Sequence, residues 1–261
     1  MINWSAIDRR SLAGRLLRLP MRALPSKSVM RVRQGPARGM KWIAGSSVHG
    51  CWLGTYELEK QKSLERFIRP GMTIYDIGAQ AGFYTLCFSR LAGDRGKVFA
   101  FEPCAYEARF LIDHVRLNHL DNVRVVQAAV CETRELLPMS SDRGMCENRL
   151  GDDPGATLMV PTISLDSSGL PVPDLIKMDV EGAEAAVLRG AHRTLREARP
   201  VLFVALHGNE QRKACAIILS DAGYSIYGLD GQRISVAPSV DEIYALPVEA
   251  QTMRPVDAHT T

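Results

Sequence analysis

The sequence has no apolar run close to the roughly 20 residues that a helix needs to cross a bilayer, although apolar residues make up 46% of its 261 residues. It also has no apolar stretch of the kind found in secretory signals. We therefore expect neither a membrane span nor a secretory signal. With 23% charged residues beside this apolar content, one domain of ordinary size can form a full core.

Paired cysteines are also missing. The chain holds six cysteines, none of them in a C-x-x-C pair, and several stand inside apolar stretches. This scatter argues against a zinc or disulfide framework and is typical of buried thiols in a reducing compartment. We therefore expect a cytoplasmic protein. The cysteines are Cys51, Cys87, Cys104, Cys131, Cys146 and Cys215.

Acidic residues are scarce only at the beginning of the chain. Residues 1–38 hold eight Arg, one Lys and one Asp, a net charge of +8, which leaves −5 for the rest of a chain whose total is +3. Apolar residues from Ile7 to Leu19 recur at helical spacing among the arginines, while three prolines argue against one long helix. Three interpretations stay open: an amphipathic helix packed on the protein, a peripheral contact with an anionic membrane or nucleic acid, and a loose tail.

The chain divides into four parts, and the main one alternates strand and helix patterns, as a doubly wound α/β domain does. The parts are a basic extension (1–38), a cap of short strands and a helix (39–70), the main domain (71–247) and a tail (248–261). In the cap, strands are predicted at 40–43 and 48–53, and a helix from Leu58 to Phe67. Glu57 has no capping-box partner, so it either points into a ligand pocket or is an acid favoured by the helix dipole.

The stretch Thr73–Leu86 predicts strand, tight turn and helix, because an apolar run is followed by Gly78 and Gly82 and then by apolar residues at helical spacing. It lacks the first glycine of the dinucleotide fingerprint and has Asp76 in its place. A carboxylate repels a pyrophosphate but suits ammonium, sulfonium and hydroxyl groups. We therefore predict a site for S-adenosylmethionine, with an ordinary capped turn as the alternative. The turn residues assigned to this donor are Asp76, Gly78, Ala79 and Gly82.

Two further strand ends complete the predicted donor site. Glu102 follows the apolar strand Lys97–Phe101, 20 residues after Gly82, where an acid can accept hydrogen bonds from both ribose hydroxyls. A solvated loop carboxylate is the alternative for Glu102. The third strand, at 123–130, has Gln127 and Ala128 near its end, which we expect to lie beside the adenine.

Ionisable residues crowd the end of a later strand. The strand Leu175–Met178 is followed by Asp179, Glu181 and Glu184. Ligands of open α/β sheets bind beyond the carboxyl ends of the strands, and charges there are costly unless they are paired or functional. We predict a pocket role for Asp179 and an ion-paired helix start for Glu184.

His207 stands at the carboxyl end of the next predicted strand, 201–207. A lone histidine is usually structural, but one beside a donor site is a candidate general base because its ordinary pKa is about 6.5. We name His207 and Asp179 as the catalytic candidates. A divalent metal is the other way to acidify a hydroxyl, but no tight carboxylate spacing calls for one, so we predict no metal site.

Together these stretches resemble the FkbM family of S-adenosylmethionine-dependent methyltransferases over about residues 40–207, two-thirds of the chain. The resemblance implies a class I methyltransferase (Rossmann-like) fold, which is a doubly wound, mostly parallel seven-stranded sheet, here with an antiparallel C-terminal hairpin and the N-terminal extension. It also implies O-methylation of a sugar, glycan or secondary metabolite. The matching motifs are Gly54–Glu57, Asp76–Tyr84, Phe101–Pro103, Gln127–Val130, Ser164–Asp166 and, most specifically, Ile176–Glu184.

Two positions depart from the family pattern. Gln80 stands where the family usually has Asn, and because that turn works largely through its backbone we expect little effect. Ala205 stands where the family usually has an acid, two residues before the strand-end histidine. This second departure puts in doubt any mechanism that orients His207 through that acid.

Two other classes remain as alternatives to a methyltransferase for small molecules or saccharides. A nucleic-acid methyltransferase would bind phosphates through the basic extension. The strand end Lys177–Val180 lacks the Asn/Asp-Pro-Pro-aromatic pattern of enzymes that methylate exocyclic amines, so nucleic acid is the less favoured acceptor. The other alternative is a binding or scaffold protein that keeps the fold. Oligomeric state stays open.

Overall fold

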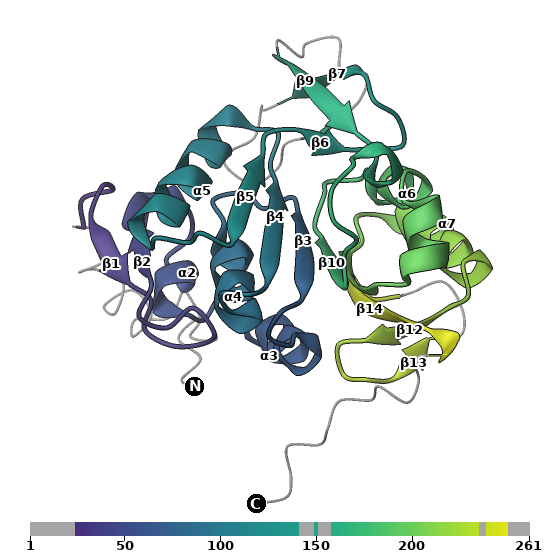
Figure 1. The fold of residues 1–261 in the computed structure, drawn as a ribbon, viewed down its shortest axis with the longest axis horizontal. Coiled ribbons are helices and arrows are strands. Elements are labelled where there is room, and N and C mark those ends of the chain that lie inside the picture. The colour runs from purple at the N-terminus through teal and green to yellow at the C-terminus, as the bar shows by residue number, and fades with distance from the viewer. Residues whose placement is uncertain (1–23, 141–148, 151–157, 235–238, 250–261) are drawn as a thin grey trace, which may run out of the picture.

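The computed structural model describes residues 24–140, 149–150, 158–234 and 239–249, and its centre is an eight-stranded sheet (Figure 1). Five neighbouring strands are parallel, and β14 and β13 run antiparallel to their neighbours. The predicted class I arrangement with its C-terminal hairpin is confirmed, and the eighth strand is the two-residue β13. In spatial order the strands are β13 (Arg233–Ile234), β12 (Tyr224–Gly228), β14 (Glu242–Pro247), β11 (Val201–Ala205), β10 (Leu175–Met178), β3 (Thr73–Ile77), β4 (Lys97–Phe101) and β5 (Val123–Val126).

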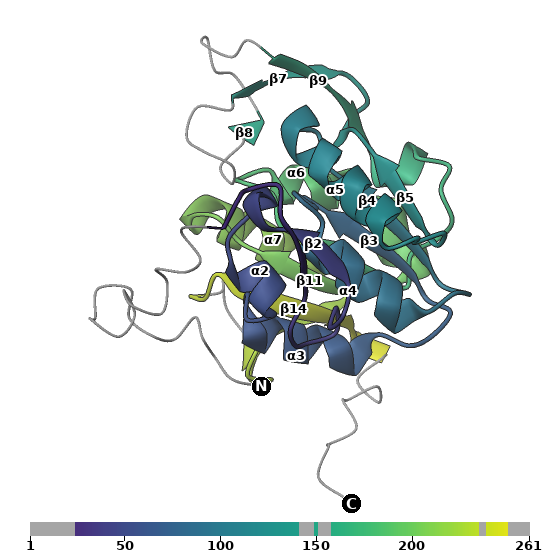
Figure 2. The same cartoon turned by 90° about the vertical axis from the view of Figure 1, so that its left-hand side faces the viewer.

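Helices cover both faces of this sheet (Figures 1 and 2). Side chains alternate along β3, so that Ile74 packs in the core under α4 while Tyr75 and Ile77 pack in the core under α6 and α7. Strands buried on both faces are apolar throughout, which is why the sequence showed them as continuous runs. One face carries α3 (Leu58–Phe67), α4 (Phe83–Ala92) and α5 (Ala105–Leu117), and the other carries α6 (Glu184–Arg189) and α7 (Asn209–Asp221).

The cap contains one of its two predicted strands. β2 (Lys41–Ile43) pairs with β1 (Val29–Arg31), so strand pairing crosses the predicted boundary between extension and cap. The prediction of a strand at 48–53 is wrong, because Gly50–Leu53 form the one-turn helix α2. A short apolar run fits either periodicity, and here Gly54 closes a helical turn with its φ of 73°.

A second, smaller sheet lies above the central sheet in Figure 1. Its longest strand runs from Leu158 to Ile163. The third strand predicted at 123–130 is instead two: β5 ends at Val126, and the chain then pairs with β9 in the smaller sheet. The order of the smaller sheet is β6 (Ala129–Val130), β9 (Leu158–Ile163), β7 (Leu136–Ser140) and β8 (Arg149–Leu150).

Five of the six cysteines fall within the described residues, and all five are free thiols. Four are buried and Cys104 is half-buried, which agrees with the predicted buried thiols. Cys146 and the extension up to residue 23 lie outside the described residues. No helix in the described part of the chain is long and apolar enough to cross a membrane.

Candidate active site

Gly78 and Gly82 allow other parts of the protein to approach the turn between β3 and α4 closely. Both have positive φ, 73° and 91°. A Cβ atom on Gly78 would lie 1.9 Å from the carbonyl oxygen of Asp179, and one on Gly82 would lie 2.4 Å from a methyl carbon of Leu111 in α5. The glycines therefore let the neighbouring strand end and α5 approach the turn. Both residues also line a cavity at the sheet edge, as their predicted donor role requires.

Gln80 contributes to the turn through its backbone. It has a φ of 48°, in the left-handed region that Asn tolerates better than most residues. Its backbone N–H donates to Glu102 Oε2 at 2.8 Å. The interaction that matters here needs no particular side chain, which supports the expectation that Gln in place of Asn has little effect.

Glu102 is held rigidly at the edge of the first of two cavities. Its Oε2 accepts from Gln80 and its Oε1 accepts from the backbone N–H of Cys104, each at 2.8 Å. Burial raises the pKa of this carboxyl to about 7, although both backbone hydrogen bonds oppose the shift. Each oxygen keeps a lone pair for a further donor. The side chain therefore fits the predicted bond to two ribose hydroxyls.

The first cavity continues from Glu102 toward the smaller sheet. Ala128 lines it, but Gln127, which we expected beside the adenine, is exposed and does not. The pairing of β5 with β4 ends at Val126, one residue before Gln127, so Gln127 is no longer part of the strand on which the prediction depended. An apolar surface suited to a flat ring is instead provided by Ile77, Phe101, Ala129, Val130 and Met139.

Asp76 has a different position from the one predicted. Its side chain is fully buried and lines neither cavity. Thr85 Oγ1 donates to its Oδ2 at 2.6 Å, and Lys177 Nζ, on the residue directly across the β3–β10 pair, lies 3.2 Å from its Oδ1. The predicted contact of this carboxylate with the donor therefore stays a prediction, and the structure gives Asp76 a pairing role. Its charge is already neutralised by a buried lysine beneath the turn.

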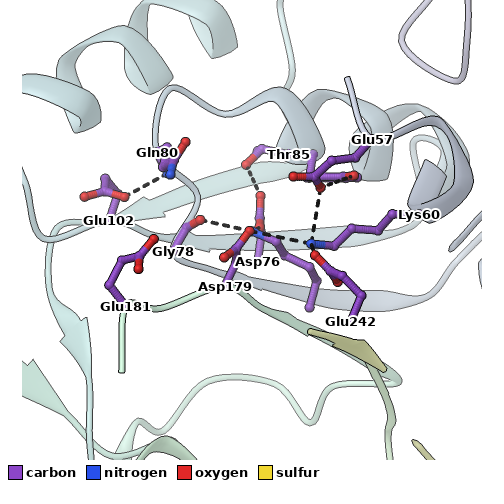
Figure 3. Close-up of polar contacts among 12 residues, drawn as sticks. Glu57, Lys60, Asp76, Gly78, Gln80, Thr85, Glu102, Asp179, Glu181 and Glu242 are labelled. Carbon is purple, nitrogen blue, oxygen red and sulfur yellow. Dashed lines mark hydrogen bonds and ion pairs between the residues drawn. The ribbon is translucent and has the colours of Figure 1, made fainter. Parts of the chain in front are cut away.

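A second buried lysine, Lys60, was missed by sequence reasoning. Its Nζ lies 2.7 Å from Glu242, 3.3 Å from Glu57 and 3.5 Å from Asp179 (Figure 3). Burial alone would lower its pKa, but the three carboxylates raise it, so the amine stays charged. Helical spacing could have revealed it, since Lys60 precedes the core residue Leu64 by four positions.

Glu57 contacts Lys60 and Tyr84 at the start of α3. It caps α3 with a φ of 46°, and its Oε2 accepts from the Tyr84 hydroxyl at 2.9 Å. It lines neither cavity; its carboxylate faces Lys60 and Tyr84 instead. The geometry therefore gives Glu57 a role in holding this lysine and tyrosine, and its contact with the donor stays a prediction.

Asp179 is the acid that reaches the ligand side. It lines the first cavity together with Glu102 and Glu181, and the second together with Lys177 and Gly78. Burial would raise its pKa, but Lys177 and Lys60 outweigh burial, so the pKa is lowered and the carboxylate is ionised. A fixed negative charge thus stands where the two cavities meet.

His207 is oriented by Glu184, which was predicted only as an ion-paired helix start. Its Nδ1 lies 2.6 Å from Glu184 Oε1, and that carboxylate is fully buried. Its Nε2 lies 3.6 Å from Glu181 and 4.0 Å from Asp179, two of the three acids that line the first cavity, although His207 itself does not line that cavity. An acid at the start of α6 therefore orients His207, although position 205 holds Ala.

The residues that line the two cavities fit the chemical groups of S-adenosylmethionine. The first cavity offers a carboxylate for the ribose and an apolar wall for the adenine, and the junction with the second cavity carries the ionised Asp179 for a cation. Lys177 beside it in the second cavity offers a positive partner for a carboxylate. Within the residues that the structure describes, no three His, Cys, Asp or Glu side chains are arranged to hold a metal ion.

The sequence pattern described as the methyltransferase FkbM domain matches residues 76–227, more than half of the chain. The chain belongs to the FkbM methyltransferase family. Among solved structures, it is similar to methyltransferase FkbM from Methylobacillus flagellatus KT, with 20% identity and a TM-score of 0.51. That likeness covers 67% of this chain and 43% of the Methylobacillus protein, so this chain spans less than half the length of the Methylobacillus protein.

Two further likenesses are weaker. A S-adenosylmethionine-dependent O-methyltransferase from Thermotoga maritima aligns with 13% identity over 74% of this chain and 65% of its own, with a TM-score of 0.48. A ribosomal RNA large subunit methyltransferase E from Alkalilimnicola ehrlichii is 42% identical over 53 residues, which is 20% of this chain and 25% of that protein. The chain described here thus covers a quarter of the length of this curated relative.

Proposed function

We propose that this protein transfers the methyl group of S-adenosylmethionine to a hydroxyl oxygen of a small molecule or saccharide. The observation that carries the proposal is His207, whose Nδ1 lies 2.6 Å from the buried Glu184 while its Nε2 faces Asp179 and Glu181 of the first cavity. A hydroxyl is a poor nucleophile until a base takes its proton, and a histidine with one nitrogen anchored is suited to that task.

The donor would bind across both cavities. Glu102 would accept from the ribose hydroxyls, and Asp179 with Lys177 would face the α-ammonium and α-carboxylate of the methionine part. The apolar wall of the first cavity would cover the adenine. This assignment keeps the predicted donor residues Gly78, Ala79, Gly82, Glu102 and Ala128 and gives Asp76 a supporting role beneath the turn.

The donor supplies a methyl group already activated by its sulfonium, so the protein needs to align the acceptor oxygen, remove its proton and exclude water. In our proposal, His207 Nε2 takes the hydroxyl proton. Glu184 keeps the imidazole in the tautomer whose Nδ1–H points at its own carboxylate. Asp179 holds the donor and does not need to accept the proton.

Titration calorimetry with S-adenosylhomocysteine tests the donor site. We expect micromolar binding by the wild type and weaker binding by Asp179→Asn. Glu59→Gln, which removes an exposed carboxylate on α3, is the matched control and should bind as the wild type does. Asp76→Ala is unsuitable, because it removes the nearest counter-charge of the buried Lys177 and would disturb the core as well as the site. A folded wild type that does not bind would leave a scaffold or binding protein.

A screen with methyl-labelled donor tests the acceptor. We expect label in hydroxylated sugars, glycosides or metabolites, and its loss in His207→Asn with donor binding retained. Transfer by His207→Asn at the wild-type rate would remove the base from the proposal. Label found only in amine-bearing acceptors would overturn O-methylation.

Nucleic acid is a second candidate acceptor because of a basic groove between the cap and α5. Lys27, Lys41, Arg109 and Arg116 line it beside a single acid, Asp113, and none of the four forms an ion pair among the described residues. The Arg109 guanidinium stacks over Phe110 at 4.8 Å, so the groove also has an aromatic side. An RNA oligonucleotide in the same screen separates the two, since label in RNA with a steep dependence on salt would favour this acceptor.

A further inference from the structure

Among the residues that the structure describes, the imidazole of His207 lies near three carboxylates, and no lysine or arginine contributes to its charge environment. Glu184 from α6 lies 2.6 Å from Nδ1, and Glu181 and Asp179, both after β10, lie 3.6 and 4.0 Å from Nε2. The lysines of the site, Lys60 and Lys177, face Asp179 from the other side. The site therefore carries more negative charge around this ring than its own cations neutralise.

This excess conflicts with a simple general base. The Glu184 carboxylate is fully buried, and its Oε2 has no hydrogen-bond partner in the described part of the chain, so the imidazolium is the nearest charge that can stabilise it. The bond from Glu184, opposed by partial burial but helped by the other acids, raises the pKa of His207 to about 9. Near neutral pH the ring is then already protonated at Nε2 and cannot take another proton.

A donor with a positive sulfonium removes the conflict, because it brings its own cation to Asp179 and Glu181. We propose that the rim formed by Asp179, Glu181, Glu184 and His207 holds one exchangeable positive charge, carried either by the donor sulfonium or by the His207 imidazolium, so that donor binding itself creates the base. This inference rests on the proposed function of the site. It assigns Glu184 as a positioning residue, because Glu184 acts through His207.

The exchange balances in atoms and charge. On donor binding, Nε2 releases its proton to solvent. During transfer, the acceptor oxygen forms a bond to the methyl carbon, the carbon–sulfur bond breaks with its electron pair going to sulfur, and the hydroxyl proton moves to Nε2. The rim holds one positive charge before the transfer and one after it, while the Nδ1 proton stays on the Glu184 side throughout.

The size of the effect is sufficient. A like charge within about 4–6 Å of an ionisable group changes its pKa by roughly 1 to 3. Starting from about 9, the pKa of His207 would fall to between roughly 6 and 8, which is the range in which a base works at neutral pH. The neutral sulfur of S-adenosylhomocysteine would leave the pKa near its starting value.

Calorimetry can count the protons. S-adenosylmethionine and S-adenosylhomocysteine are titrated separately, without acceptor, at pH 8 in two buffers with different ionisation enthalpies. The two ligands share the α-ammonium, ribose and adenine, so the difference in proton release isolates the sulfonium. We expect S-adenosylmethionine to release a large fraction of one proton more than S-adenosylhomocysteine, since a group with different pKa values in two states exchanges protons between them.

Variants separate this exchange from a structural role. His207→Asn should bind both ligands and abolish the difference in proton release, whereas His119→Asn, at an exposed histidine on the basic groove, should keep it. Glu184→Gln should shrink the difference, because His207 would already be mostly neutral at pH 8 in the free protein. The imidazole nitrogen shifts of His207, followed by NMR against pH, give the same information directly.

Equal proton release by two ligands that both bind would overturn the charge exchange and leave the donor site intact. Unequal release that persists in His207→Asn would also overturn it, because another group would then be titrating. If neither ligand binds the folded protein, the proposed function fails first and the exchange fails with it.

Discussion

Two acids at the same edge of the sheet, Glu102 after β4 and Asp179 after β10, are held in opposite ways. Glu102 is fixed by backbone N–H groups, and burial outweighs both these hydrogen bonds and the charge of Lys177, so its pKa is raised to about 7. Asp179 is also partly buried, but two lysines reverse the effect of burial and lower its pKa. Glu102 is therefore suited to accept hydrogen bonds, and Asp179 is suited to carry a negative charge. The neighbouring groups cause this difference.

The strongest test of this comparison removes the lysine on the Asp179 side. Lys177→Met leaves the fully buried Asp76 without its counter-charge, and breaking a buried pair in this way costs roughly 3–5 kcal/mol of unfolding free energy. Chemical denaturation measures it. The double variant Asp76→Asn with Lys177→Met should recover most of the loss, because no buried charge is then left alone. A stable single variant would contradict the importance of this pair.

Asp179→Asn should affect binding more than folding. The side chain is partly exposed to the cavities, whereas its loss removes the ionised partner of the donor's cationic groups. A charged hydrogen bond is worth roughly 1.5–3 kcal/mol, or about 10- to 150-fold in affinity. Titration calorimetry gives the affinity and thermal unfolding gives the stability. Unchanged affinity would mean that the donor does not reach this acid.

Glu102→Gln should have a smaller effect on binding and the same effect on both ligands. The amide keeps one acceptor oxygen but turns a donor toward either Gln80 or Cys104, so one neutral hydrogen bond is lost at roughly 0.5–1.5 kcal/mol. S-adenosylmethionine and S-adenosylhomocysteine should weaken equally, since both carry the ribose. A loss confined to the sulfonium ligand would contradict the separation between the two acids.

The smallest effect concerns Glu107, which lies near Glu102 and forms no ion pair with any residue that the structure describes. It is buried, its Oε1 has no hydrogen-bond partner in the described residues, and burial raises its pKa to about 7. A folded-state pKa above the unfolded value means that this carboxyl costs stability increasingly as pH rises from about 4.5 through about 7.

Glu107→Gln should therefore raise the unfolding free energy at pH 8 by about 1 kcal/mol, since the buried amide still loses hydration. At pH 4 the variant and the wild type should be equally stable. Denaturation at both pH values measures the difference, and Glu135→Gln on the exposed surface should show no pH-dependent gain. An equal gain at both pH values would show that ionisation is not the cause.

The sequence predicted most of the main domain because its signals are local. Apolar runs of β3, β4 and β10, each followed by glycine or acid and then by helical spacing, fix strand, turn and helix within a few residues. The error at 48–53 arose where a short apolar run fits both periodicities. The strand predicted at 123–130 divides because its last residues pair with β9, a contact that no local pattern contains.

The ion pairs of the site were not predicted, because their partners are far apart in the sequence and meet only in the folded chain. By itself the sequence determined the α/β fold, the glycine turn and the presence of acids at the strand ends, since these follow from periodicity and backbone geometry. Only the tertiary structure decided that Asp76 pairs with Lys177 across two strands and that Glu184 orients His207. It also decided that Lys60 contacts three acids, which are Glu57, Asp179 and Glu242. The physical reason is that a buried charge must meet a partner wherever the fold brings one near, and that partner comes from another element of the chain.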